Sequence, residues 1–171
     1  ASGSTSVILD NRAPVIASAS ISSSGSGGQA FVDSTLTCAV SSSDLDGEAI
    51  LDSFSWWISG NQVGTASSFS LDPSMVAPQD IVECMVTSAD GYGGTATDSV
   101  SITVGNVVPV IASSTLTPTE PNVSDVLLCE ATASDLEDSG PSLSFSFSNL
   151  STGVSYAASS TTTASASLDL S

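Results

Sequence analysis

The sequence predicts an all-β fold made of tandem antiparallel β-sandwiches, and three observations support this prediction. Short runs of residues alternate between apolar and polar side chains, which is typical of strands with one buried face. Turn-forming pairs that contain Gly, Pro, Asp or Asn separate these runs. A block of the sequence also recurs 95 residues further along the chain, which is typical of a repeat protein.

The alternation places sets of apolar side chains on one face of each expected strand. These sets are Leu36, Cys38 and Val40; Phe54, Trp56 and Ile58; Val82, Cys84 and Val86; and Val100, Ile102 and Val104. Turns are expected at Asp46-Gly47, Gly60-Asn61, Asp72-Pro73 and Asp90-Gly91, because such pairs favour the backbone conformations of tight turns. Short strands at this spacing indicate an antiparallel sandwich.

The repeat is visible in two blocks. Residues 11–18 (Asn-Arg-Ala-Pro-Val-Ile-Ala-Ser) recur as residues 106–113 (Asn-Val-Val-Pro-Val-Ile-Ala-Ser). Residues 34–46, which contain the first cysteine, match residues 125–137, which contain the third. The proline of each first block stands where a first strand is expected to begin, at a sheet edge where a missing N–H group is harmless.

The two ends of the chain fit the same repeat. Residues 5–11 resemble residues 100–106, which form the expected closing strand of the repeat. The sequence therefore predicts the last strand of a preceding repeat at 1–11, a complete repeat at 12–105, and a second repeat at 106–171 that lacks its last strands. We expect a longer chain to supply those strands, because a repeat cannot bury its faces without them. Donation of strands by a neighbouring subunit is the alternative.

The charge balance limits the partners that the chain can bind. It has 18 acidic residues, one basic residue (Arg12) and no histidine, which gives a net charge of −17. Binding to nucleic acid or to an anionic membrane surface needs several Lys or Arg residues, so both are excluded. No apolar run approaches the roughly 18 residues that a membrane-spanning helix needs, so membrane insertion is not expected.

The missing residue types also exclude most catalytic chemistry. Without histidine there is no Ser-His-Asp triad, no Cys-His dyad and no histidine zinc site. Without lysine there is no Schiff-base or P-loop chemistry. No pair of carboxylates stands out as a glycosidase pair. We therefore expect that the chain is not an enzyme.

Several motifs resemble a known group of extracellular domains. The spacing of Cys38, Trp56 and Cys84 is similar to that of the B-strand cysteine, C-strand tryptophan and F-strand cysteine of immunoglobulin domains. With Asn-x-x-Pro-Val-Ile, Asp-Leu-Asp-Gly and the segment 84–94, nearly the whole chain resembles the PKD, Ig-like and cadherin-like tandem repeats of large prokaryotic surface proteins. The resemblance implies tandem immunoglobulin-like (PKD-type) antiparallel sandwiches at an extracellular, cell-surface location. Val82 departs from antibody-type domains, which carry a tyrosine two residues before the second cysteine.

The same resemblance implies a disulfide bond between Cys38 and Cys84 that joins the two sheets. Unpaired buried thiols are the alternative for these two cysteines. Cys129 occupies the place of Cys38 in the second repeat, so its partner is expected beyond the chain end or in another subunit. Disulfides form outside the cytoplasm, which agrees with an extracellular location.

One acidic segment has the character of a calcium site. Asp44, Asp46 and Glu48 place carboxylates at alternate positions around a glycine turn, and such hard oxygen ligands suit Ca²⁺. In a sandwich, the loops that carry these residues lie at the end where the first strand enters. The expected ligands are therefore Asn11, Asp44, Asp46, Glu48 and Asp90 in the first repeat, and Asp135, Glu137 and Asp138 in the second. A solvated turn whose aspartates bind local N–H groups is the alternative.

Two further groups of residues indicate contacts with sugars. Asn122 and Asn149 begin Asn-x-Ser sequons, which are acceptors of N-linked glycans. Trp57 is expected to point away from Trp56. An exposed Trp57 or Tyr92 offers a flat surface on which a sugar ring can stack or a neighbouring subunit can pack. Coverage of Trp57 by its own hairpin is the alternative.

The sequence as a whole predicts a non-catalytic structural segment of an extracellular fibre or filament. Its expected partners are copies of itself or neighbouring repeats, stacked head to tail, because junctions such as 105–109 are too short to behave as flexible coil. The alternatives are an adhesin or carbohydrate-binding module, and a spacer domain of a secreted enzyme. Ca²⁺ is the cofactor that these residues suggest.

Overall fold

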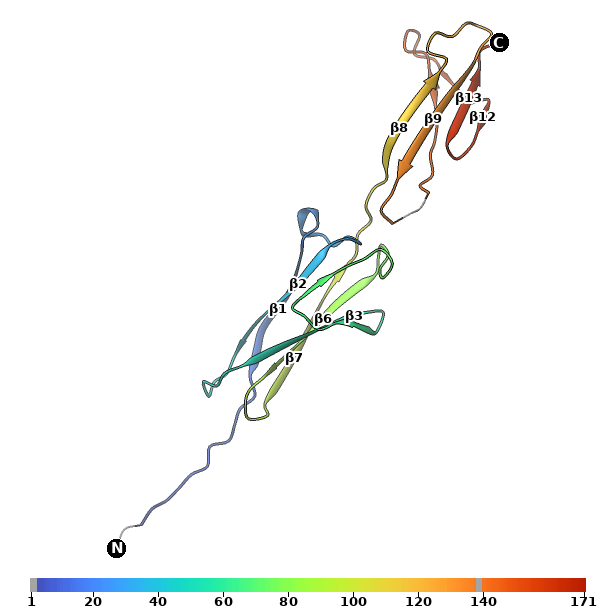
Figure 1. Ribbon diagram of the computed structural model, residues 1–171. Helices are drawn as coiled ribbons and strands as arrows, with labels where there is room; N and C mark the ends of the chain where they lie inside the picture. Colours follow the sequence, from blue (N-terminus) through green and yellow to red (C-terminus); the bar gives the residue numbers. More distant parts are fainter. Residues whose placement is uncertain (1–2, 138–139) are drawn as a thin grey trace. The chain divides into compact units, whose positions relative to one another are not determined.

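The computed structural model describes residues 3–137 and 140–171, and these form two compact units, Ala1–Asn106 (unit 1) and Val107–Ser171 (unit 2) (Figure 1). The strands that pair into sheets in the described residues are all antiparallel, and loops, turns and one short 3-10 turn at Ser26–Gly28 connect them; these residues contain no α-helix. The predicted all-β class is therefore confirmed. No helix in the described part of the chain is long and apolar enough to cross a bilayer.

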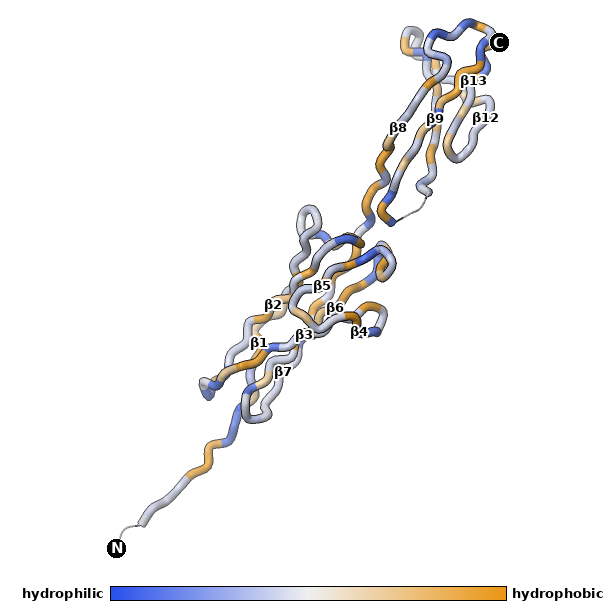
Figure 2. The backbone as a smooth tube through the Cα atoms, viewed as in Figure 1, coloured by the Kyte–Doolittle hydropathy of each residue, from blue (hydrophilic) through white to orange (hydrophobic). Residues whose placement is uncertain are grey.

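Unit 1 is a sandwich of two antiparallel sheets. One sheet has the order β1 (Val15–Ser23), β2 (Thr35–Ser43) and β5 (Ser68–Ser70), and the other has the order β4 (Asn61–Gly64), β3 (Leu51–Ile58), β6 (Ile81–Ala89) and β7 (Thr95–Thr103). β1 begins directly after Pro14 and is an edge strand, as the sequence predicts. The segment Val7–Leu9 precedes β1, is exposed, and is the orange stretch of the N-terminal tail in Figure 2. It pairs with no strand, so its assignment to a preceding repeat stays a prediction.

The core of unit 1 lies between its two sheets. The alternating apolar residues of β2, β3 and β6 all face it, and Leu36, Trp56 and Val82 are completely buried. Cys38 on β2 and Cys84 on β6 form a disulfide that joins the two sheets, so the predicted pairing is confirmed. Each fully buried apolar side chain of this size contributes about 1.5–3 kcal/mol of transfer free energy.

Trp56 is the largest side chain of this core. Its ring stacks on Phe69 of β5, with 5.9 Å between the ring centroids, and so connects the two sheets. Its indole N–H donates a 2.8 Å hydrogen bond to the carbonyl of Ala66, which satisfies the one polar atom of the side chain. Strand alternation turns Trp57 to the opposite face, as predicted, and there it is half-buried.

The turn between β3 and β4 is shifted by one residue from the predicted Gly60-Asn61 pair. Ser59 and Gly60 occupy the turn, with φ of 50° and 78°, and Asn61 already begins β4. Two consecutive positive φ angles define the turn type whose twist matches a two-residue hairpin. Asn is the residue that usually occupies the first position of such a turn. Here Ile58 pairs with Asn61, so the first turn position is taken by Ser59.

Unit 2 has a four-stranded sheet with the order β12 (Ser160–Thr161), β13 (Ser165–Asp169), β9 (Val126–Ser134) and β8 (Val110–Thr117), and a hairpin of β10 (Phe147–Ser148) and β11 (Ser155–Tyr156). β8, β9 and β13 pair as β1, β2 and β5 do in unit 1. Phe147, Ala166 and Leu168 form its buried core. Cys129 is half-buried against this core and carries no disulfide in the described residues, so its expected partner stays a prediction.

Candidate functional site

Three carboxylates meet at the end of unit 1 where the chain enters β1. Asp44 and Glu48 belong to the loop between β2 and β3, and Asp90 follows β6. Each residue offers one oxygen atom, and these three oxygens lie within 4.8 Å of one another. The loops meet because the ends of β1, β2, β3 and β6 lie at the same edge of the sandwich. We call this group the carboxylate cluster.

Two oxygens of the carboxylate cluster have no hydrogen-bond donor among the described residues. They are Oδ2 of Asp44 and Oε2 of Glu48, and both are shielded from solvent. Loss of hydration raises the pKa of Glu48, and the negative charges of the Asp90, Asp44 and Asp46 carboxylates raise it further. The cluster therefore concentrates negative charge that a divalent cation would neutralise, and its hard oxygen atoms are ligands that Ca²⁺ prefers.

Asp90 is held by hydrogen-bond donors on both of its oxygens. Its Oδ2 accepts a 2.9 Å bond from Nδ2 of Asn11, and its Oδ1 accepts 2.8 Å bonds from the N–H groups of Tyr92 and Gly94. The Asn11 bond is the main cause of the lowered pKa of Asp90, and the backbone donors add to it while desolvation opposes it. Asp90 thus ties the chain before β1 to the loop between β6 and β7.

Two glycines allow these loops to approach one another. A Cβ atom at Gly94 would overlap the Asp90 carboxylate and would lie 2.8 Å from Cα of Ala13. Gly47 has a φ of +81°, a conformation that residues with a side chain rarely adopt. It separates Asp46 from Glu48, and these two carboxylates face different partners.

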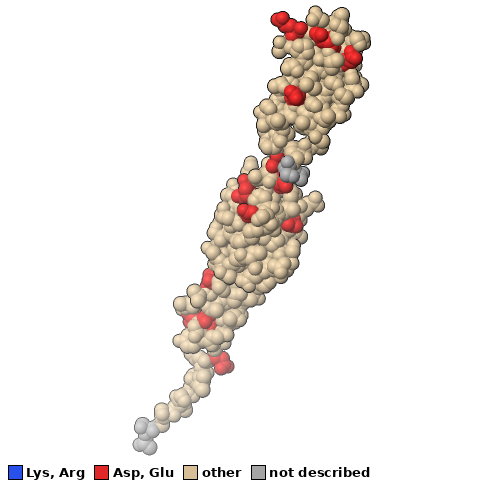
Figure 3. Space-filling model, turned by 45° about the vertical axis from the view of Figure 1, so that its right-hand side comes forward, with Lys and Arg blue, Asp and Glu red and all other residues tan. Residues whose placement is uncertain are grey.

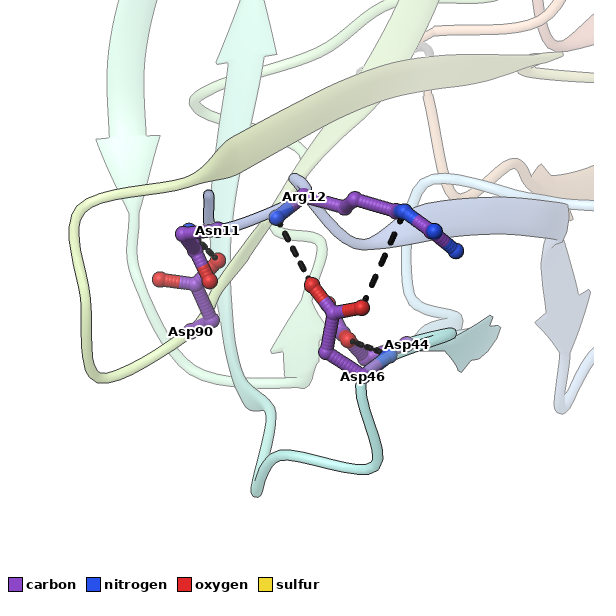
Figure 4. Close-up of polar contacts among 5 residues, drawn as sticks. All are labelled: Asn11, Arg12, Asp44, Asp46 and Asp90. Atoms are coloured by element: carbon purple, nitrogen blue, oxygen red, sulfur yellow. Dashed lines mark hydrogen bonds and ion pairs between the residues drawn. The ribbon is translucent and has the colours of Figure 1, made fainter. Parts of the chain in front are cut away.

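The carboxylate of Asp46 faces the entering chain (Figure 4). Its Oδ2 accepts a 2.8 Å hydrogen bond from the backbone N–H of Arg12, and its Oδ1 lies 3.7 Å from Nε of the same residue. The backbone N–H of Asp46 in turn donates a 2.7 Å bond to Oδ1 of Asp44. We call this chain of contacts from Arg12 through Asp46 to Asp44 the carboxylate latch of unit 1.

Unit 2 contains the same latch. The backbone N–H of Val107 donates a 3.0 Å bond to Oε1 of Glu137, and the N–H of Glu137 donates a 2.9 Å bond to Oδ1 of Asp135. In both units the donor stands two residues before the proline that precedes the first strand. The two units therefore anchor their entering chain in the same way, although one uses aspartate and the other glutamate.

The structure brings only some of the predicted calcium ligands together. Asp44, Glu48 and Asp90 form the cluster, whereas Asp46 binds Arg12 and Asn11 directs its amide N–H group at Asp90. Asp135 and Glu137 take part in the latch of unit 2, and Asp138 lies outside the described residues. A calcium site in unit 2 stays a prediction.

The two aromatic residues singled out as a binding surface do not share one surface. Trp57 lies near the end of β3, where it pairs with Glu83, and its indole N–H donates a 2.9 Å bond to Oγ of Ser55. Tyr92 lies beyond the opposite end of the sheet, beside the carboxylate cluster, and 75% of it is exposed. A single platform made of both rings is therefore absent from unit 1.

Both sequon asparagines are exposed in unit 2. Asn122 donates through its backbone N–H to Asp125 at 2.6 Å, and Asn149 accepts bonds from the N–H groups of Ser151 and Thr152 at 2.9 and 3.1 Å. Both residues thus stabilise local turns. Their glycosylation stays a prediction.

The latches were not predicted from the sequence, although a signal for them exists. Both copies of the Asn-x-x-Pro-Val-Ile block are followed by an Asp-Leu-Asp or Asp-Leu-Glu segment, and the third residue of that segment is the latch acceptor. The chain matches no protein-family model, no curated protein and no solved structure.

Proposed function

We propose that the chain is a non-catalytic structural segment of an extracellular fibre on the surface of a prokaryotic cell, built from tandem Ig-like (PKD-type) sandwiches. The observation that carries the proposal is the carboxylate latch, which both units form at the same place with different residues. A repeated anchor for the entering chain is expected in a protein whose units act in series. The disulfide between Cys38 and Cys84 supports a location outside the cytoplasm.

The latch suits a chain that carries a load. A pull on the fibre is transmitted to each unit through the residues that precede its first strand, and the latch fixes the backbone of Arg12 or Val107 at this point. A hydrogen bond that involves a charged group is shorter and stronger than a neutral one. The latch thereby reduces the freedom of the entering chain without any added side-chain packing.

The proposed fibre is tested by immunogold electron microscopy on the source cells, with an antibody raised against residues 12–105. We expect gold particles in rows along thin filaments outside the cell. Label confined to the cytoplasm would contradict the extracellular location. Gold label on short particles, together with binding of the purified chain to a glycan array, would favour an adhesin instead. Gold label on a secreted hydrolase would favour the enzyme spacer.

We also propose that the carboxylate cluster binds Ca²⁺ and so holds the two loops against the entering chain. The support is the pair of shielded carboxylate oxygens and the charge that raises the pKa of Glu48. When bound, the ion would replace repulsion between Asp44, Glu48 and Asp90 with shared coordination. Unit 1 keeps its sandwich core without the ion, because that core does not involve these residues.

Calcium is therefore expected to raise the unfolding temperature of unit 1 by about 5 °C or more at concentrations well above the dissociation constant. Tryptophan fluorescence measures this unit alone, because both tryptophans lie in it. Asp44→Asn should abolish most of the rise, whereas Asp98→Asn, at an exposed position of β7, should keep it. An unfolding temperature that does not respond to Ca²⁺ or EDTA would refute the site.

A further inference from the structure

The outward face of the β1–β2–β5 sheet in unit 1 is uncharged and consists mostly of hydroxyl side chains. None of the three strands contains a charged residue. The exposed outward positions are Val15, Ser18, Ser20, Ser22, Thr35, Thr37, Ala39, Ser41, Ser43, Ser68 and Ser70. We call this surface the hydroxyl face.

The hydroxyl face contrasts with the rest of a strongly acidic chain. In the view of Figure 3, the Asp and Glu side chains form separate patches over the surface. The other sheet of unit 1 carries Glu83 on β6 and Asp98 on β7. In the matching sheet of unit 2, the residue that corresponds to Ala39 of β2 is Glu130 of β9. The absence of charge is thus a property of this one sheet and not of the repeat.

Several hydroxyl groups of this face are oriented by contacts with one another and with the sheet. Thr35 and Ser70 pair across the strands at 3.1 Å between their hydroxyl oxygens, and Thr37 and Ser68 pair at 3.5 Å. The hydroxyl of Ser68 also donates a 3.2 Å bond to the carbonyl of Leu36. Short side chains held in this way lose little conformational entropy when a second surface covers them.

Electrostatics restrict how copies of this chain can pack side by side. With a net charge of −17 and one basic residue, which already pairs with Asp46, two copies cannot form a set of salt bridges. Carboxylates repel one another strongly only within a Debye length, which is about 8 Å at physiological salt. Contact through an uncharged face places no carboxylate of these three strands against a carboxylate of the second copy.

We propose that the hydroxyl face of unit 1 is a lateral contact surface for the hydroxyl face of a second copy of this chain. Each hydroxyl is both a donor and an acceptor, so two identical faces can satisfy each other's hydrogen bonds. The proposal deepens the structural role proposed above and rests on it. It adds the means by which parallel fibres adhere to one another.

The size of the face sets the strength of the contact. The sheet has nine residues in β1, nine in β2 and three in β5; at about 3.3 Å per residue and about 4.8 Å between strands, these give an area of roughly 330 Å². That is less than half of the roughly 800 Å² that one partner buries in a stable complex. Two isolated chains therefore associate weakly, and many units in register along two fibres would associate firmly.

Cysteine crosslinking of the purified chain at high concentration tests the proposal, in a Cys129→Ser background that removes the free thiol. Thr37→Cys lies on the central strand of the hydroxyl face, and Ser99→Cys, on the outward side of β7, is the matched control. With a short bismaleimide, we expect covalent dimers from Thr37→Cys in at least about fivefold excess over the control, a ratio that corresponds to about 1 kcal/mol. Equal dimer yields from the two positions would overturn the proposal.

A second substitution distinguishes a specific contact from crosslinking by random encounter of two chains in solution. Ala39→Glu introduces the residue that unit 2 carries at this place, so the fold is expected to tolerate it. Combined with Thr37→Cys, it should lower the dimer yield about fivefold, because two carboxylates then face each other. An unchanged yield, or intact-mass evidence that glycans cover these hydroxyls in the native protein, would overturn the proposal. The immunogold result does not depend on this face, so the two proposals can fail separately.

Discussion

Trp56→Ala is expected to lower the free energy of unfolding of unit 1 by about 3–5 kcal/mol, the range measured for removal of a fully buried large aromatic side chain. Trp56 is completely buried, stacks on Phe69 from the opposite sheet, and adjoins the disulfide through the pairing of its strand with Cys84. Its removal opens a cavity between the sheets and leaves the carbonyl of Ala66 without its donor. Urea unfolding followed by the fluorescence of Trp57 measures the loss.

Trp57→Ala is the matched control, because the two tryptophans are adjacent in sequence and point to opposite faces of β3. Trp57 is half-buried, and its indole N–H binds the hydroxyl of Ser55 on its own strand. We expect its removal to cost about 1 kcal/mol, in line with a partly exposed side chain. Equal losses for the two variants would show that the sandwich core is not where the structure places it.

The strands and the core could be predicted because each depends on a local pattern. Alternation along a strand decides which side chains are buried, and it correctly separated Trp56 from Trp57 and placed Leu36 and Val82 in the core. The pairing of Cys38 with Cys84 followed from a resemblance in spacing, and the structure confirms it. Proline before the first strand of each unit also marked the strand boundary correctly, since β8 begins directly after Pro109.

The site was predicted less well because it depends on loop conformation. The sequence presents Asp44, Asp46 and Glu48 as equivalent carboxylates, but the left-handed backbone at Gly47 separates the second from the third. Asp46 then binds a backbone N–H of the entering chain, and Glu48 joins Asp44 and Asp90. The periodicity of the sequence does not predict which backbone N–H group a carboxylate will bind. The recurrence of the same contact in unit 2 is what identifies it as a feature of the repeat.

Loss of the disulfide is expected to destabilise unit 1 by an amount similar to the loss of Trp56, but by a different route. Cys38 and Cys84 are 46 residues apart, and closing a loop of this length removes about 4 kcal/mol of chain entropy from the unfolded state. The variant Cys38→Ala/Cys84→Ala should therefore lower the urea midpoint strongly. Cys129→Ser should leave it unchanged, because that cysteine lies in unit 2.

The slope of the urea transition distinguishes the two routes. Without the disulfide, the unfolded chain expands and exposes more surface, so the denaturant dependence of the unfolding free energy should become steeper. Trp56→Ala acts on the folded core, so its slope should stay near that of the parent chain. If the double cysteine variant instead kept the parent slope and lost less than about 1 kcal/mol, the disulfide would not constrain the unfolded chain. Packing around Trp56 would then hold the two sheets together almost alone.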